Sequence, residues 1–152
     1  MESASSSQTF FAGEFLHQID EKHRITIPSR WRRNGQGEEF ILLAEQNLQC
    51  LLVMPPNEFE RVSASAAQAP GISASDIRKF QRQLHARAQH GSTDRQGRLV
   101  LPDDLCKQLD LKGEVALIGS PGRFEIWNPA RWKRAHQDEH QTYQQVANLV
   151  GL

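Results

Sequence analysis

The chain has 152 residues, of which 38% are hydrophobic, so it is long enough for one ordinary domain or two small ones around a modest core. Its 18 Lys and Arg residues balance 18 Asp and Glu residues, which excludes a strong overall field that would attract an anionic partner. Any electrostatic binding site must therefore be local. The first residues lack the basic and apolar segments of a signal peptide, and no apolar run is long enough to cross a membrane, so we expect a cytoplasmic protein with no membrane partner.

The first half of the chain predicts a short hairpin and further strands. Residues 1–9 are polar and rich in serine, and we expect them to be disordered. The segments of the expected hairpin are a strand over residues 10–19, a turn over 20–23 and a second strand over 24–27. Apolar stretches at residues 40–44 and from residue 50 onward predict two further strands. Residues 10–62 are therefore expected to form a first repeat.

A linker and a helix are expected between the two halves, over residues 63–88. Residues 64–75 are rich in Ala, Ser, Gly and Pro, which is typical of a linker. A helix is predicted from Ser75 to about Ala88, with Ser75 or Asp76 as its cap. Its predicted apolar side consists of Ile77, Phe80 and Leu84, and its opposite surface carries Arg78, Lys79, Arg82 and Arg87.

The second half repeats the order of the first. The stretch DRQGRLVLP begins at Asp94 and matches DEKHRITIP, which begins at Asp20, 74 residues earlier. In each copy an Asp is followed by three residues, an Arg, a short apolar alternation and a Pro. A short helix after Pro102 and two further strands complete a second repeat over residues 89–134, and residues 135–152 are expected to form a C-terminal helix or tail. The shared order indicates an internal duplication.

The repeated phrase contains the residues that a type I turn favours. Asp94 stands at the first position, where its carboxylate can accept a backbone N–H two residues later, and Gly97 stands at the last. Asp20 is the equivalent turn-structuring residue of the first copy. We therefore expect each hairpin to display an arginine, Arg24 or Arg98, near its tip. An alternative is that each Asp–Arg pair only locks its turn. The residues expected on the buried face of the following strands are Ile25, Ile27, Leu99 and Leu101.

The chain resembles the MraZ family along nearly its whole length, from FAGEFLHQIDEKHRITIP through RLVLPDDL to RFEIWNPARW. The resemblance implies a mostly β (α+β) fold with short helices, in which two tandem swapped-hairpin AbrB-like β-barrel repeats form a pseudo-twofold double-split barrel. It implies a ring-like homo-oligomer, an octamer or a dodecamer. It also implies a nucleoid-associated transcriptional regulator of the bacterial division and cell-wall gene cluster, which binds short tandem repeats of double-stranded DNA in its own promoter. The first copy departs from the family pattern because His23 replaces a glycine.

Local clusters of basic residues independently indicate nucleic acid as a partner of this neutral chain. Phosphate neutralisation requires such clusters, and Arg and Lys can also read guanine edges. The candidate DNA-binding residues are Lys22, His23, Arg24, Arg30, Arg32 and Arg33, and the motif of the second copy is Asp94, Arg95, Gly97 and Arg98. Because Asp103 and Asp104 follow Arg98 along the chain, we expect the first hairpin to bind phosphate more strongly than the second.

Other classes of function have less support in the sequence. No nucleophile elbow, phosphate loop or dinucleotide fingerprint is present, so we expect no enzyme, no cofactor and no small-molecule substrate. His136 and His140 have metal-ligand spacing without further ligands nearby, so a metal-dependent hydrolase is a weak alternative and no metal is expected. Cys50 and Cys106 are expected to be buried, reduced thiols. The main alternative is an oligomeric structural module whose basic patches bind an acidic protein.

Overall fold

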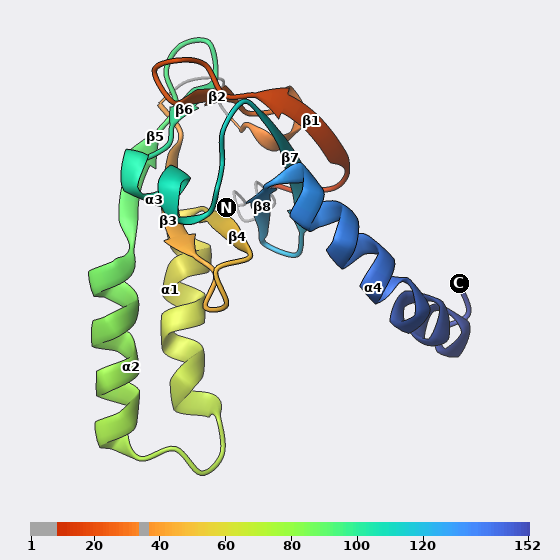
Figure 1. Cartoon of the computed structure of the whole chain (residues 1–152). Helices are drawn as coiled ribbons and strands as arrows, with labels where there is room; N and C mark the ends of the chain where they lie inside the picture. Colours follow the sequence, from red (N-terminus) through yellow and green to blue (C-terminus); the bar gives the residue numbers. More distant parts are fainter. Residues whose placement is uncertain (1–8, 34–36) are drawn as a thin grey trace, which may run out of the picture.

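The computed structural model describes residues 9–33 and 37–152, in which a core of β-strands carries helices on its outside (Figure 1). The strands are β1 (Glu14–Gln18), β2 (Arg24–Thr26), β3 (Glu39–Ala44), β4 (Cys50–Met54), β5 (Gln89–Ser92), β6 (Arg98–Val100), β7 (Glu114–Ser120) and β8 (Arg123–Trp127). The helices are η2 (Ser29–Trp31), α1 (Pro56–Ser65), η3 (Ala66–Gln68), α2 (Ala74–Arg87), α3 (Asp103–Gln108) and α4 (Pro129–Leu149). The expected disorder of residues 1–9 concerns a segment that, apart from Thr9, lies outside the described residues.

The two repeats exchange strands, and this exchange defines the fold. The strand order of the large sheet is β1-β7-β8-β4-β3-β5, so β1 of the first repeat pairs with β7 of the second, and β5 of the second pairs with β3 of the first. Replacing each strand by its counterpart in the other repeat reverses this order onto itself, which places a pseudo-twofold axis between β8 and β4. The prediction of a mostly β fold built from two swapped-hairpin repeats is confirmed.

The second strand of each hairpin forms the small sheet that joins the repeats. β2 and β6 are antiparallel, and their pairing continues beyond the strands themselves. The backbone N–H of Ile27 donates to the carbonyl of Gly97 at 2.9 Å, and that of Leu101 donates to the carbonyl of His23 at 2.8 Å. The turn of each hairpin is therefore bonded to the chain of the other repeat. The predicted inward face is confirmed, because Ile25, Ile27, Leu99 and Leu101 are all buried.

An aromatic cluster fills the core. Trp31, Phe40 and Phe124 are fully buried, and the ring centroids of Trp31 and Phe124 lie 4.9 Å apart. The indole N–H of Trp31 donates to the carbonyl of Ala12 at 3.0 Å, which satisfies its one polar group. These rings stabilise the core through their buried area, so they are not available to stack on nucleic-acid bases.

The two cysteines are buried and free, as predicted. Burial raises the pKa of the Cys50 thiol, and burial together with nearby carboxylates raises that of Cys106 to about 11. Both thiols therefore remain protonated near neutral pH, and neither has the thiolate character that metal binding or nucleophilic chemistry requires.

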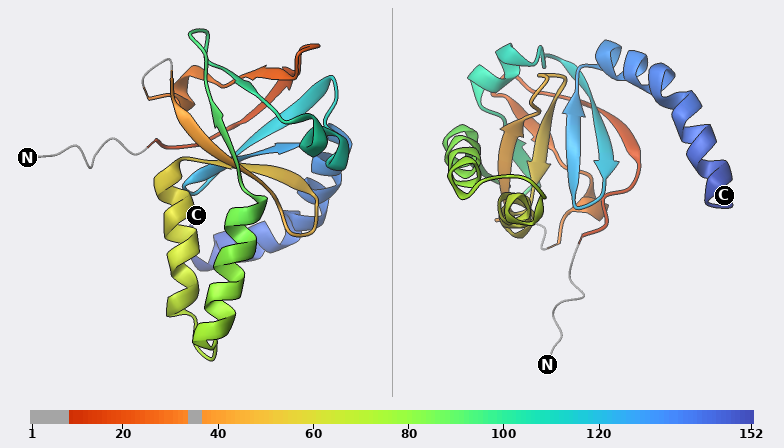
Figure 2. Two further views of the ribbon diagram at one scale, coloured as in Figure 1. Left: turned by 90° about the vertical axis from the view of Figure 1, so that its left-hand side faces the viewer. Right: turned by 90° about the horizontal axis from the view of Figure 1, so that it is seen from below.

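Helices α1 and α2 form an antiparallel hairpin that extends away from the strands (Figures 1 and 2). Helix α2 begins at Ala74, and its N-cap is Ser73, whose hydroxyl accepts the N–H of Asp76 at 3.1 Å. The prediction of Ser75 or Asp76 as the cap was wrong, because the Ser73 hydroxyl reaches the free N–H groups of the first turn. The predicted apolar side is only partly buried, since Leu84 is covered but Phe80 is 43% exposed.

Helix α4 extends from the end of the large sheet into solvent (Figure 1). It has 21 residues, none of them buried. Trp132 packs its ring against Trp127, with centroids 5.4 Å apart, which anchors the start of the helix. None of the helices that the structure describes combines the length and the apolarity needed to cross a bilayer.

A buried carboxylate connects α1 to β8. Glu58 accepts two hydrogen bonds from Arg61, both at 2.9 Å, and one from Arg123 at 3.0 Å. Gly122 leaves the space for this carboxylate, because a Cβ there would lie 2.7 Å from the Glu58 carboxyl carbon. The hydrogen bond from Arg61 in the first place, and that from Arg123, lower the pKa of Glu58. The ionised form is therefore the stable one in the folded protein.

We expect Glu58→Gln to lower the free energy of unfolding at pH 7 by about 1–3 kcal/mol, because it leaves two guanidinium groups without their carboxylate. The folded-state pKa of Glu58 lies below its ordinary value of 4.5, so its contribution is present above that pH and is lost as pH falls through the lowered pKa. Urea unfolding at pH 7 and in acid measures this. Glu60→Gln, at an exposed neighbouring residue, is the control; equal stability of the two variants at pH 7 would contradict the prediction.

Candidate nucleic-acid interface

The turn of the first hairpin is locked by one aspartate. One carboxylate oxygen of Asp20, Oδ1, accepts the backbone N–H of Lys22 at 2.9 Å and that of Arg24 at 2.8 Å. The other, Oδ2, accepts Nε–H of Arg24 at 2.7 Å. The backbone N–H of His23 also donates to the carbonyl of Asp20 at 3.0 Å. The carboxylate thus fixes both the backbone of the turn and the arginine that follows it.

The second turn repeats this arrangement atom for atom. Asp94 Oδ1 accepts the backbone N–H groups of Gln96 and Arg98, each at 2.9 Å, and Oδ2 accepts Nε–H of Arg98 at 2.8 Å. In both turns the pKa of the aspartate is lowered, first by the backbone hydrogen bond from the arginine and further by its side chain. The turn-structuring roles assigned to Asp20 and Asp94 agree with this geometry.

Both arginines take part in the lock, and each is only partly exposed. The side chains of Arg24 and Arg98 are 27% and 28% exposed, so they are displayed less freely than we expected from the sequence. The lock uses Nε, and a guanidinium carries four further N–H groups on its two Nη atoms. An arginine held in this way can therefore support its turn and still donate to a phosphate.

His23 occupies the place that Gly97 has in the second turn, and both have left-handed backbones. Their φ angles are 61° and 76° respectively. A side chain in this conformation has a steric cost that a glycine avoids. The imidazole Nε2 of His23 lies 3.4 Å from Oδ1 of Asp103, at the start of α3. With His23 in place of a glycine, the first turn therefore keeps the left-handed backbone of the second, and its side chain lies beside an acidic residue.

At the second turn the neighbour is an arginine. A Cβ on Gly97 would lie 2.1 Å from Nη1 of Arg32, so the guanidinium of Arg32 covers this glycine closely. The Nε atom of Arg32 is buried and has no hydrogen-bond partner in the part of the chain that the structure describes. Its positive φ therefore favours a glycine at residue 97, and the space that Arg32 fills requires one.

The exchange of strands therefore gives each turn the charged neighbours that we expected at the other turn. The order of residues along the chain places Asp103 after Arg98, but in the fold Asp103 lies against His23 of the first turn. Arg32 follows the first hairpin in sequence but lies against Gly97 of the second. The expected neutralisation of Arg98 by Asp103 was wrong, because the β2–β6 pairing places each segment beside the opposite hairpin. Sequence reasoning also overlooked Glu21, an exposed acid in the first turn.

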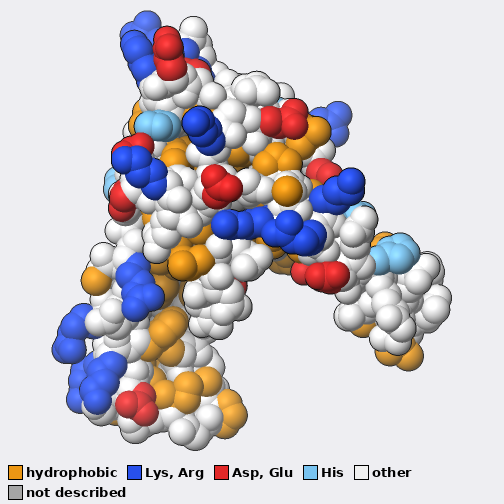
Figure 3. Space-filling model, viewed as in Figure 1, with side chains coloured by type: hydrophobic (Ala, Val, Ile, Leu, Met, Phe, Trp, Pro, Cys, Tyr) orange, Lys and Arg blue, Asp and Glu red, His pale blue; other side chains and the backbone are white. Residues whose placement is uncertain are grey.

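The remaining candidates are distributed over several places. Lys22 and Arg95 are exposed on the two turns, which lie at the same end of the molecule (Figures 1 and 2), and Arg30 is exposed on η2. Arg33 lines a small cavity of about 140 Å³ with Pro55 and Glu58, so the structure does not group it with the turns. Lys and Arg side chains gather at the hairpin end and along the helical hairpin in Figure 3.

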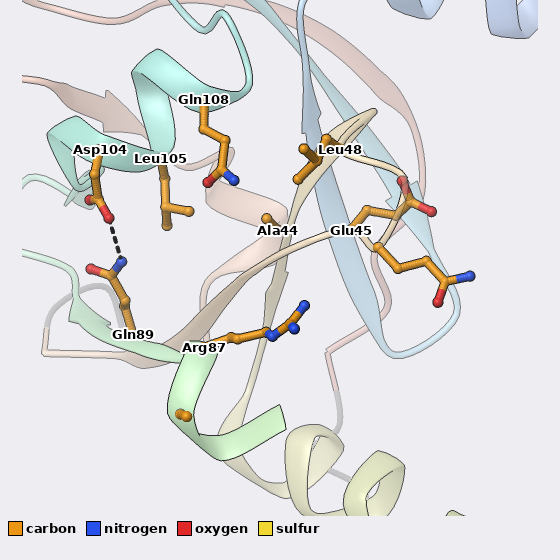
Figure 4. A pocket seen from close by; sticks show the side chains of 10 residues that line it. Ala44, Glu45, Leu48, Arg87, Gln89, Asp104, Leu105 and Gln108 are labelled. Carbon is orange, nitrogen blue, oxygen red and sulfur yellow. Dashed lines mark hydrogen bonds between the residues drawn. The ribbon is translucent and has the colours of Figure 1, made fainter. Parts of the chain in front are cut away.

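The larger pockets do not extend this basic surface. A polar pocket of about 370 Å³ lies between α3, the end of α2 and the β3–β4 turn, where Arg87 reaches toward a space that Glu45 and Asp104 also line (Figure 4). His136 and His140 line a groove on α4. No group of three or more His, Cys, Asp or Glu residues is placed to hold a metal ion within residues 9–33 and 37–152.

Comparison with known proteins agrees with the duplication. The profile of the family described as "MraZ protein, putative antitoxin-like" matches the chain twice, at residues 10–83 and 84–151. A protein of Desulforamulus reducens named Transcriptional regulator MraZ is 34% identical over 143 residues, which cover 93% of this chain and 99% of that protein. A protein of the same name from Symbiobacterium thermophilum is 36% identical over 141 residues, covering 92% and 99%.

Both matches of the profile contain one Asp–Arg turn, and the relatives align over almost the whole chain. The duplicated turns, the exchanged strands and the similarity of sequence lead to the same assignment. The chain belongs to the MraZ family.

Proposed function

We propose that this protein is a DNA-binding transcriptional regulator and not an enzyme. The observation that carries the proposal is the pair of identically locked turns, which hold Arg24 and Arg98 on the rigid frame of the two paired hairpins. Binding residues held on such a scaffold need little further ordering when they meet a phosphate backbone. The relatives named Transcriptional regulator MraZ support the same function.

The proposed target is double-stranded DNA with short tandem repeats, in the promoter of the division and cell-wall gene cluster to which its own gene belongs. The proposed contacts are basic residues that are at least partly exposed and that lie on the two turns, on η2 or directly after η2. They are Lys22, Arg24, Arg30, Arg32, Arg95 and Arg98. His23 and Arg33 are secondary members of this set, because one faces Asp103 and the other lines the cavity beside Glu58. Such a protein would act in the cytoplasm, at the nucleoid.

We further propose that the protein assembles into a ring-like homo-oligomer, an octamer or a dodecamer. Helix α4 presents exposed apolar side chains, including Tyr143, Val146 and Leu149, along its outer part. An apolar stripe of this kind on a helix is usually covered by a partner. In a ring, the same weak turn would be presented several times, so tandem DNA repeats could be bound with high avidity by protomers that are neutral overall.

The main alternative is a structural module whose basic surface binds an acidic protein. The two functions differ in what the partner must present. A phosphate backbone gives a steep salt dependence through counterion release, and a promoter gives a preference for one DNA sequence. An acidic protein surface requires neither.

We expect the protein to bind a duplex from the region upstream of its own gene, with a dissociation constant that rises steeply with salt concentration. A plot of the logarithm of the dissociation constant against the logarithm of the salt concentration should have a slope of about 0.9 for each phosphate that the protein neutralises. Fluorescence anisotropy at several salt concentrations measures this. An unrelated duplex of equal length is the control and should bind at least about a thousandfold more weakly. Equal affinity for both duplexes would argue against a sequence-specific regulator.

Light scattering should give a mass several times the 17.3 kDa of one chain at micromolar concentration. Val146→Lys should shift the protein toward smaller species, because it places a charge on the exposed apolar stripe of α4. Gln145→Lys adds the same charge at the neighbouring residue and serves as the control. A monomeric wild-type protein would contradict the proposed assembly.

Arg24→Ala and Arg98→Ala should each lower Tm by a few degrees, and by similar amounts, because each removes the same Nε hydrogen bond to its aspartate. Circular dichroism melts of the two variants measure this. Arg78→Ala, on the exposed surface of α2, is the control for the loss of an arginine. A loss of stability in only one of the two turn variants would show that the locks are not equivalent.

A further inference from the structure

We infer that the second turn, together with Arg32, is the main phosphate-binding surface of this protein, and that the first turn contributes less. This inference rests on the proposed DNA-binding function and reverses the preference expected from the sequence. The surface consists of Arg32, Arg95 and Arg98, and it is called the second-turn surface below. It combines residues of both repeats, because Arg32 comes from the first and the two other arginines from the second.

The position of Arg32 is the first argument. Its guanidinium lies over Gly97, so close that a side chain at residue 97 would collide with it. Its Nε–H is buried without a hydrogen-bond partner among the described residues. Arg24 and Arg98 each form a salt bridge with an aspartate, whereas Arg32 forms none within the described residues. A guanidinium that is held in place and has no acidic partner is suited to bind an anion that comes from outside the chain.

The charge of the second-turn surface is the next argument. Residues 94–98 contain one acid, Asp94, and two bases, Arg95 and Arg98, so this turn has a net charge of +1. Arg32 raises the charge to +2. Arg95 is exposed, and it has no ion pair in the part of the chain that the structure describes. A phosphate approaching this end meets the carboxylate of Asp94, which is already shared between backbone N–H groups and Arg98. The nearby carboxylate of Glu38, whose backbone is bonded to Thr93, is buried and accepts the backbone N–H of Arg33.

The first turn has the opposite balance. Two acids, Asp20 and Glu21, offset Lys22 and Arg24, so residues 20–24 carry no net charge before His23 is counted. Helix α3 adds Asp103 and Asp104 against Lys107, a net charge of −1, and Asp103 lies 3.4 Å from the His23 ring. Lys107 is itself paired with Asp103 at 3.1 Å.

Screening makes these local differences decisive. Charges act over about 8 Å at physiological ionic strength, so a phosphate at one turn responds mainly to the groups in contact with that turn. The chain has no net charge that could add a general attraction. The two turns have the same hydrogen-bonded frame, and their surroundings alone favour phosphate at the second.

The matched test uses Arg95→Gln and Lys22→Gln. Each variant removes one exposed positive charge from one turn and leaves both Asp–Arg locks intact. Both are titrated by fluorescence anisotropy, as full-length folded proteins, with the upstream duplex and with a mixed-sequence duplex at several salt concentrations. Arg95→Gln should weaken binding to both duplexes about fivefold or more and reduce the salt slope by about 1 per bound turn. Lys22→Gln should change the affinity by less than about twofold.

Two further variants test the roles of Arg32 and Asp103. Arg32→Gln should weaken binding in the same way as Arg95→Gln, with Arg78→Gln on α2 as its control. Asp103→Asn should instead strengthen binding, because it removes the acid beside the first turn. Circular dichroism checks that each variant is folded. If Arg32→Gln does not fold, the comparison of Arg95→Gln with Lys22→Gln decides which turn binds phosphate more strongly.

The outcomes separate this inference from the proposed function. If the wild-type protein binds neither duplex, the DNA-binding function fails, and this inference fails with it. If the wild-type protein binds and Lys22→Gln costs as much affinity as Arg95→Gln or more, the function stands and the preference for the second turn is overturned.

Discussion

The pairing of β2 with β6 places each hairpin against the chain of the other repeat, and the rest of the molecule depends on this contact. The hydrogen bonds from Ile27 to Gly97 and from Leu101 to His23 fix one turn at each end of this small sheet. The inward faces of the same strands supply part of the core. A substitution that disturbed this small sheet would therefore affect the core and the candidate interface together.

Each turn owes its rigidity to the number of acceptor sites on one carboxylate. Asp20 and Asp94 each accept two backbone N–H groups and one guanidinium N–H. These bonds favour the ionised form of the aspartates and lower their pKa values, so the turns are stable at any pH at which the aspartates are charged. The same bonds fix the backbone and the Nε atom of Arg24 and of Arg98, so that each guanidinium is held in one position. A binding surface requires preorganisation of this kind.

The neutral overall charge of the chain is compatible with an anionic partner because the charges are distributed unevenly. Arg32, Arg95 and Arg98 come together at the second turn, whereas Asp103 and Glu21 accompany the first. A single turn of this kind is a weak site, and repetition in an oligomer would multiply it without a need for a basic protein. Under the proposed function, local surroundings, and not composition, would determine where a phosphate binds.

The sequence by itself determined the duplication, the two turns and the alternation that buries Ile25 and Leu99, because these depend on spacing and on residues close together in the chain. It also indicated which residue types could meet DNA. Only the tertiary structure decided which charges surround which turn. Asp103 follows Arg98 in sequence but contacts His23, and Arg32 follows Arg24 but covers Gly97. The physical reason is the strand exchange, since pairing between distant segments is set by the whole sheet and cannot be derived from local order.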